Sequence, residues 1–139
     1  MSKLLEPFEV MGLRFKNRII HEPTTLNMSD PQGYATRRLA AAYGSIARGG
    51  YAATIVGATC VRRDGLINER MLGLYDEDYV IEFRDTVSEI KNNDSLAGIQ
   101  LFYGGLIPGL GTTVPLAPGK GWIPGTVSWG PSNKYFIGN

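Results

Sequence analysis

Three apolar stretches, each ending in small or polar residues, constrain most strongly how this chain can fold. They cover about Arg18–Glu22, Ala53–Thr59 and Leu96–Phe102. The middle stretch is almost continuously apolar, as is typical of a parallel strand that is buried on both faces. The first stretch runs through a proline into the small and polar residues Thr24–Met28. Because parallel α/β folds bind ligands at the carboxyl ends of their strands, we expect these three ends to share one rim, with the first of them at a ligand site.

Two amphipathic helices are predicted between these strands. The first covers about Thr36–Arg48, where Thr36 is a suitable N-cap and a glycine pair follows the last turn. The second begins after Asp76, another suitable cap, and has Lys91 near its end, where a positive charge is favourable. The apolar residues expected on the buried faces are Leu39, Ala42, Tyr43, Ile46 and Ala47 in the first helix and Val80, Phe83, Val87 and Ile90 in the second.

Two further segments lie outside this alternation of strands and helices. Leu4–Phe15 contains two short alternating runs around Met11-Gly12. This pattern predicts a hairpin or a pair of short strands that caps the larger fold. The segment Arg62–Leu74 is polar and irregular, so we expect a surface loop there.

The order strand, helix, strand, helix, strand predicts an α/β fold, either a barrel or an open doubly wound sheet. A doubly wound nucleotide fold needs glycines directly after its first strand, where this chain has Pro23–Asn27. A (β/α)8 barrel instead places ligand groups at the ends of many strands, which agrees with the pattern of all three. Such a barrel needs about 200 residues or more. We therefore predict the N-terminal portion of a (β/α)8 TIM barrel, an N-terminal hairpin plus about three βα units, that is incomplete on its own.

The composition of the chain changes after residue 103. Half of the 18 glycines and five of the 8 prolines fall in residues 104–139, without a helical or strand period. Four aromatic residues in this segment are too apolar for a freely solvated tail. They are Trp122, Trp129, Tyr135 and Phe136. The predicted division is thus 1–103, the N-terminal part of the barrel, and 104–139, a Gly/Pro-rich loop or tail that packs on the rest of the barrel.

Composition excludes several classes of function. A chain of 139 residues with 43% hydrophobic content can form one globular domain. Its net charge of +1 gives no electrostatic reason to expect a nucleic acid or an anionic membrane surface as a partner. A single cysteine, Cys60, excludes an internal disulfide framework and is too little for a zinc or iron–sulfur site. No run is apolar enough for a signal peptide or membrane span, so we expect a cytoplasmic protein without a bound metal.

An ordered series of short motifs runs through residues 4–103. The motifs are Leu5-Glu6-Pro7-Phe8, Asn17-Arg18-Ile19-Ile20, Pro23, Asn27-Met28, Gly33-Tyr34-Ala35-Thr36, Tyr43, Ala47-Arg48-Gly49-Gly50, Ala58-Thr59 and Gln100-Leu101. In this order and spacing the chain resembles the old yellow enzyme family of NADH:flavin oxidoreductases. Within that family it is most similar to the branch of 2-enoate reductases and 2,4-dienoyl-CoA reductases. The resemblance covers about the first third of a family barrel.

The resemblance implies an FMN-binding barrel that passes hydride from NAD(P)H through the flavin to an activated carbon–carbon double bond. Pro23 and Thr24 match the segment beside the isoalloxazine ring, and Thr25 matches the residue that tunes the flavin. Ala58 matches the small residue whose backbone meets the ring, and Gln100 the amide that pairs with its pyrimidine edge. A carboxamide offers both a donor and an acceptor, and a hydroxyl near a ring carbonyl stabilises charge that develops on reduction. The family's proton donor and phosphate-binding residues lie on later strands, so no catalytic residue is expected here.

Two functional alternatives follow. The first is part of an FMN-dependent ene-reductase that acts on an enoate, enoyl-CoA or enone, completed by a polypeptide carrying the remaining barrel strands. Any iron–sulfur cluster or FAD, as in the long branch of the family, would lie outside this chain. The second is a non-catalytic assembly subunit of a split barrel with an altered or lost flavin site, which departures from the family at His21-Glu22, Gly57 and Phe102 suggest.

Overall fold

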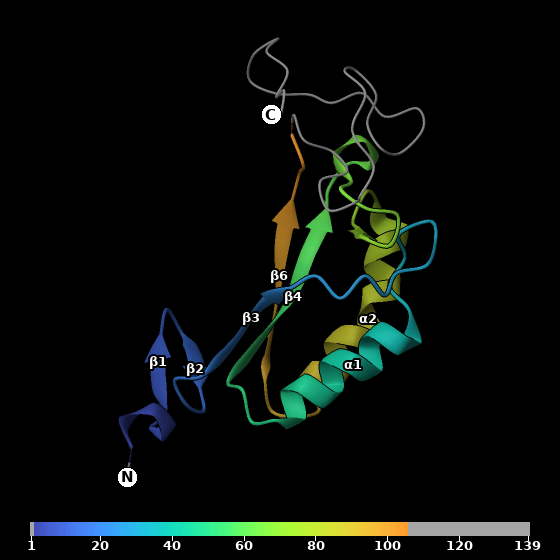
Figure 1. Cartoon of the computed structure of the whole chain (residues 1–139). Helices are drawn as coiled ribbons and strands as arrows, with labels where there is room; N and C mark the ends of the chain where they lie inside the picture. The colour runs from blue at the N-terminus through green and yellow to red at the C-terminus, as the bar shows by residue number, and fades with distance from the viewer. Residues whose placement is uncertain (1, 106–139) are drawn as a thin grey trace, which may run out of the picture.

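Three parallel strands form the centre of the fold: β3 (Ile20–Thr24), β4 (Ala53–Cys60) and β6 (Leu96–Phe102) (Figure 1). The strand β4 pairs with both of the others and lies between them. The computed structural model describes residues 2–105. A two-residue strand, β5 (Leu72–Gly73), pairs with the last residues of β4. Because β6 occupies one edge of β4 along its whole length, β3 and β5 share the other edge, β5 lying beyond the point where β3 ends. The predicted parallel sheet is confirmed.

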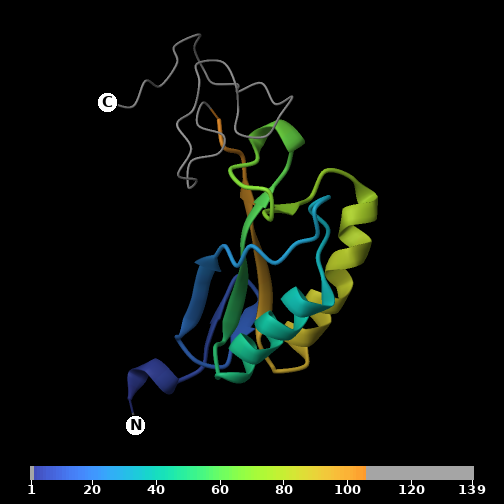
Figure 2. The same cartoon turned by 45° about the vertical axis from the view of Figure 1, so that its right-hand side comes forward.

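Helices α1 (Arg37–Arg48) and α2 (Glu77–Lys91) lie on the same side of this sheet (Figure 2). Both begin at the predicted caps: Leu39 N–H donates to Thr36 Oγ1 over 3.2 Å, and Asp78 N–H donates to Asp76 Oδ1 over 3.0 Å. The main core lies between helices and sheet and consists of Ala35, Leu39, Tyr43, Ala47, Val56, Leu72, Phe83 and Ile90. The helices therefore bury one face of the sheet and hold the strand ends in register.

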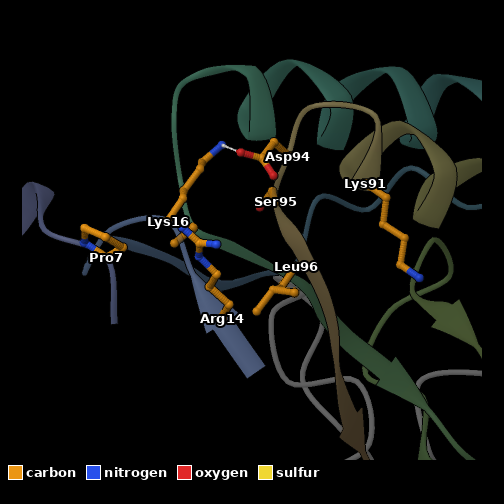
Figure 3. Close-up of a pocket in the computed structure, with 8 residues that line it drawn as sticks. Pro7, Arg14, Lys16, Lys91, Asp94, Ser95 and Leu96 are labelled. Carbon is orange, nitrogen blue, oxygen red and sulfur yellow. Dashed lines mark ion pairs between the residues drawn. The ribbon is translucent and has the colours of Figure 1, made fainter. Parts of the chain in front are cut away.

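The predicted hairpin is also confirmed. After a short 3-10 helix, η1 (Lys3–Leu5), strands β1 (Phe8–Val10) and β2 (Leu13–Phe15) pair antiparallel around Met11-Gly12. Both turn residues have positive φ, 50° and 77°, as a tight hairpin turn requires. At the amino-terminal end of the sheet, near the start of β6, a pocket lies between the hairpin and the end of α2 (Figure 3). Its charged lining residues are Arg14, Lys16, Lys91 and Asp94.

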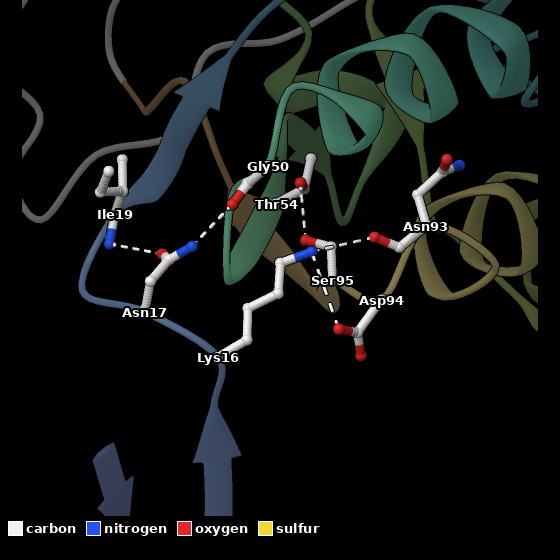
Figure 4. A network of polar contacts seen from close by, with 8 residues as sticks. All are labelled: Lys16, Asn17, Ile19, Gly50, Thr54, Asn93, Asp94 and Ser95. Carbon is white, nitrogen blue, oxygen red and sulfur yellow. Dashed lines mark hydrogen bonds and ion pairs between the residues drawn. The ribbon is translucent and has the colours of Figure 1, made fainter. Parts of the chain in front are cut away.

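Polar contacts attach the hairpin to this end of the sheet (Figure 4). Lys16 Nζ donates to Asn93 O over 3.0 Å and lies 4.0 Å from Asp94 Oδ2. Asn17 donates through Nδ2 to Gly50 O and accepts through Oδ1 from Ile19 N–H. The Asn17 turn explains why the first strand starts at Ile20, two residues later than the prediction of Arg18–Glu22.

Two other local predictions are wrong in part. Val80 was expected in the core, yet its side chain is 53% exposed. The buried residues of α2 are Tyr79, Phe83, Thr86 and Ile90. Val80 follows Tyr79 and so lies about 100° further round the helix. The segment Arg62–Leu74 is not only a surface loop, because Met71 and β5 are buried and β5 extends the sheet. The strand β5 has only two residues and follows a polar segment, so the spacing of apolar residues does not predict it.

Within residues 2–105, no helix is long and apolar enough to cross a membrane. The Gly/Pro-rich segment predicted for 104–139 lies, apart from its first two residues, outside the described part of the chain.

Candidate functional site

The carboxyl ends of the three main strands lie side by side. Thr24 is in register with Val56, and Val56 with Ile99. This alignment brings all five residues of the predicted site to one end of the sheet: Pro23, Thr24 and Thr25 from β3 and the residue after it, Ala58 from β4 and Gln100 from β6. Thr24, Thr25 and Gln100 are exposed, whereas Ala58 is buried. The site can therefore offer a ligand two hydroxyls and a carboxamide.

A β-bulge interrupts the pairing of β3 with β4 at this level. His21 pairs with Thr54, and the next pair is Thr24 with Val56. Two residues of β3, Glu22 and Pro23, thus oppose the single residue between Thr54 and Val56. Proline cannot donate to a ladder of hydrogen bonds, and a bulge is one of the few places in a sheet that tolerates it. The bulge explains how Pro23 can stand in the strand at all.

A second bulge interrupts the pairing of β4 with β6. Val56 pairs with Ile99 and Thr59 with Leu101. Two residues of β4, Gly57 and Ala58, therefore oppose Gln100 alone. Bulges bend a strand, redirect side chains and are frequent at barrel rims and beside active sites. Both bulges coincide with the residues that the sequence pattern and the family resemblance assign to the cofactor.

Tyr43 of α1 joins the two interrupted strands. Its hydroxyl donates to Thr24 O over 3.0 Å and accepts from Gly57 N–H over 2.7 Å. The side chain is fully buried. Burial raises the pKa of Tyr43 above its usual value, although the hydrogen bond from Gly57 opposes this shift. The hydroxyl thus keeps its proton and can serve as donor and acceptor at once.

Gly57 allows the ends of β3 and β4 to approach closely. A Cβ atom at this position would lie 2.0 Å from Thr24 O and 2.7 Å from Thr25 N. Both atoms belong to the backbone and cannot rotate away. Only glycine fits between the strand ends.

The peptide group between Thr24 and Thr25 presents a donor to the rim. In a trans peptide the C=O and N–H groups point in roughly opposite directions. Since Thr24 O accepts from Tyr43, the N–H of Thr25 points away from that hydroxyl. Together with the exposed Gln100, this N–H makes an uncharged set of donors and acceptors that suits a flat, neutral, polar ring.

Residues 3–108 match the model of the NADH:flavin oxidoreductase / NADH oxidase family. The chain belongs to this family. The resemblance to the old yellow enzyme family is confirmed, whereas the comparisons do not distinguish the 2-enoate reductase branch.

Relatives of this flavin oxidoreductase chain are much longer than the chain itself. An NADPH dehydrogenase of Bacillus cytotoxicus is 33% identical over 118 residues, which are 84% of this chain and 34% of that protein. Among solved structures, 2-naphthoyl-CoA reductase in complex with 2-naphthoyl-CoA has a TM-score of 0.73 and 19% identity over 76% of this chain and 16% of its own. The old yellow enzyme from Trypanosoma cruzi has a TM-score of 0.67 and 24% identity over 76% of this chain and 28% of its own.

The chain thus spans about a third of the length of the curated relatives it matches. The solved neighbours are TIM barrels, so the fold is part of such a barrel, as predicted. The carboxyl ends of barrel strands carry the active sites in this architecture, and the two bulges lie at those ends.

His21 lies outside the rim in this member of the flavin oxidoreductase family. Its ring packs edge-on against Tyr43 and Tyr51, with centroid distances of 6.5 and 5.4 Å. Glu22, the next residue, is exposed. His21 is therefore a structural residue whose described ring contacts are with tyrosines.

Arg63, predicted to lie in a solvated loop, has a structural role on the loop after β4. Its Nη2 donates to Tyr79 Oη over 2.6 Å, and its guanidinium lies 5.0 Å from the centre of the Tyr75 ring. Tyr79 in turn donates to Gln32 O over 3.1 Å. Burial raises the pKa of both tyrosines, so they keep their protons. This cluster connects the two loops that follow β3 and β4.

Proposed function

We propose that this chain supplies the first part of the FMN site in an NAD(P)H-dependent oxidoreductase that reduces an activated carbon–carbon double bond. The observation that carries the proposal is the coincidence of two β-bulges with Pro23, Ala58 and Gln100 at the strand ends. Membership of a flavin oxidoreductase family and the names of the dehydrogenase relatives support it. A bound flavin would accept hydride from the nicotinamide and deliver it to the double bond.

The residues of the rim would bind and orient the flavin. Gln100 offers a carboxamide oxygen and an N–H donor to adjacent groups of the ring edge. Thr25 offers a hydroxyl and a backbone N–H, both suited to an oxygen that gains negative charge on reduction. Ala58 is small enough to let the backbone of the bulge approach the ring. Pro23 and Thr24 shape the side of the site.

The proposed substrate is an enoate, an enoyl-CoA or an enone. The structural neighbour 2-naphthoyl-CoA reductase was solved with 2-naphthoyl-CoA, an unsaturated acyl thioester, which supports the acyl-CoA possibility within this set. It also agrees with placement in the branch of 2-enoate reductases and 2,4-dienoyl-CoA reductases.

We also propose that a polypeptide with the remaining barrel strands completes this site. Within the described residues, neither β3 nor β6 has a further partner strand on its outer edge. Ile20 and Ile99 on these strands are partly exposed, and Leu101 is 61% exposed. Exposed apolar side chains on an unpaired strand indicate a surface that another element covers. Residues 1–103 would then form the barrel part, and 104–139 would pack on the rest of it.

Replacing Gln100 with alanine tests the flavin site. In the native protein that contains this chain, we expect Gln100→Ala to raise the dissociation constant for FMN about tenfold, because about 1.4 kcal/mol of hydrogen bonding is lost. The measurement is FMN fluorescence during titration of the stripped protein. Gln32→Ala is the matched control, since Gln32 lies on an exposed loop and only its backbone forms described hydrogen bonds.

Equal FMN affinity of both variants would contradict the assignment of Gln100. A native complex that contains the chain but no flavin would instead support the alternative function, a non-catalytic assembly subunit of a split barrel.

A further inference from the structure

We propose that Tyr43 is a positioning residue that sets the orientation of the flavin-contacting strand ends from behind the sheet. The inference rests on the proposed flavin site and goes beyond it, because Tyr43 is fully buried and is not one of the proposed flavin contacts. Its ring belongs to the main core, between α1 and β4. Only its hydroxyl reaches the rim.

The two bulges create the need for this hydroxyl. In a regular parallel pair, the N–H of Gly57 would bond to a carbonyl of the neighbouring strand. Here that N–H donates to the Tyr43 hydroxyl, which donates in turn to Thr24 O. The hydroxyl thus bridges the ends of β3 and β4 at the bulge. A hydroxyl has a single proton, so its donor capacity is used completely by Thr24.

Each of these bonds fixes a peptide group next to a proposed flavin contact. The bond to Thr24 O fixes the plane of the peptide that carries the Thr25 N–H. The bond from Gly57 N–H fixes the peptide between Val56 and Gly57, one residue before Ala58. The two proposed flavin contacts, at Thr25 and Ala58, are made by backbone groups, so they depend on the orientation of the peptide planes and not on side-chain rotamers. Tyr43 therefore sets the relative position of two contacts that come from different strands, and a displacement of about 1 Å at such positions has large effects on function.

The test uses Tyr43→Phe in the native protein that carries the chain. The phenyl ring keeps the core filled, while Gly57 N–H and Thr24 O lose their shared partner and can reorient. We expect the dissociation constant for FMN to rise about tenfold. We also expect the visible absorption maxima and the reduction potential of the bound flavin to shift. A purely structural role would lower the thermal stability without changing the spectrum of the flavin that remains bound.

Tyr79→Phe is the matched control. Tyr79 is also fully buried, and its hydroxyl also accepts one hydrogen bond, from Arg63, and donates one, to Gln32 O. The loss of stability should be similar in the two variants, whereas the spectrum and affinity of FMN should change only in Tyr43→Phe. Equal FMN affinities and identical spectra in both would overturn the positioning role.

Two further measurements separate the possible failures. If the unmodified protein binds no FMN, the proposed function fails. If it binds FMN and Gln100→Ala weakens binding while Tyr43→Phe behaves like Tyr79→Phe, only the positioning inference fails. If Tyr43→Phe does not fold, 3-fluorotyrosine at position 43 keeps the ring and hydroxyl but alters hydrogen-bond strength. A flavin spectrum identical to that of the unmodified protein would then overturn the inference.

Discussion

Replacement of Gly57 with alanine should lower the free energy of unfolding by about 3 kcal/mol or more, a value at the upper end for overpacking. The added Cβ would lie 2.0 Å from Thr24 O and 2.2 Å from Thr24 C. Both are backbone atoms of the neighbouring strand, so the strands must separate to make room. Separation would also break the bond between Gly57 N–H and Tyr43. Denaturant unfolding of the native protein measures the loss of stability. The flavin content of the variant measures the effect of breaking the bond between Gly57 N–H and Tyr43.

Gly98→Ala is the matched control for this substitution. Gly98 lies on β6, and an added Cβ would have as its nearest neighbour Ile55 Cγ1 at 3.3 Å. A side-chain methylene can move by a few tenths of an ångström, so we expect a change of less than about 1 kcal/mol. Similar losses of unfolding free energy in the two variants would contradict the explanation that the close approach of β3 requires glycine at position 57.

The sequence predicts the regular elements well where burial follows a period. The strand Leu96–Phe102 has the predicted bounds, and α1 differs by one residue because Thr36 is its cap. Both ends of α1 have local signals, the cap Thr36 and the glycine pair after Arg48. The prediction for Val80 is wrong because the spacing of apolar residues along a helix does not show which side of the helix a second helix will cover. The buried β5 was missed because two residues are too short for any period.

The site could be predicted only in part. Polar strand ends and a family resemblance predict five site residues, and the structure brings them to one end of the sheet: Pro23, Thr24, Thr25, Ala58 and Gln100. Their contact with FMN stays a prediction. The bulges could not be predicted, because they depend on the register between strands that are distant in sequence. A glycine inside an otherwise apolar strand was the available signal for Gly57.

The role of the Tyr43 hydroxyl was also beyond pattern analysis. In the helical stripe this residue is equivalent to Leu39 or Ala47, and all three are buried in the same core. Nothing in the spacing indicates that one of them carries a hydroxyl with two backbone partners on different strands. The available signal was chemical: a tyrosine at a fully buried position usually requires a hydrogen-bond partner.

Leu39→Ala should lower the free energy of unfolding of the native protein by about 2–5 kcal/mol, the range for a buried leucine. Leu39 is 1% exposed and packs in the core that α1, α2 and β4 share. The cavity would loosen α1, the helix that carries Tyr43, so FMN affinity should fall together with stability. Denaturant unfolding and FMN titration measure the two effects. Leu39→Met, which conserves volume, should cost less than about 1.5 kcal/mol and keep FMN affinity.

The substitution Leu101→Ala tests whether a polypeptide with the remaining strands completes the barrel. Within residues 2–105 this side chain is 61% exposed on β6, where its removal would change stability by about 0.5 kcal/mol or less. If a polypeptide with the rest of the barrel packs against β6 and covers the face that carries this side chain, Leu101 becomes a core residue of the native protein. Leu101→Ala should then cost about 2 kcal/mol or more, approaching the cost of Leu39→Ala. A change near zero in the native protein would contradict the proposal that further barrel strands pack beside β6.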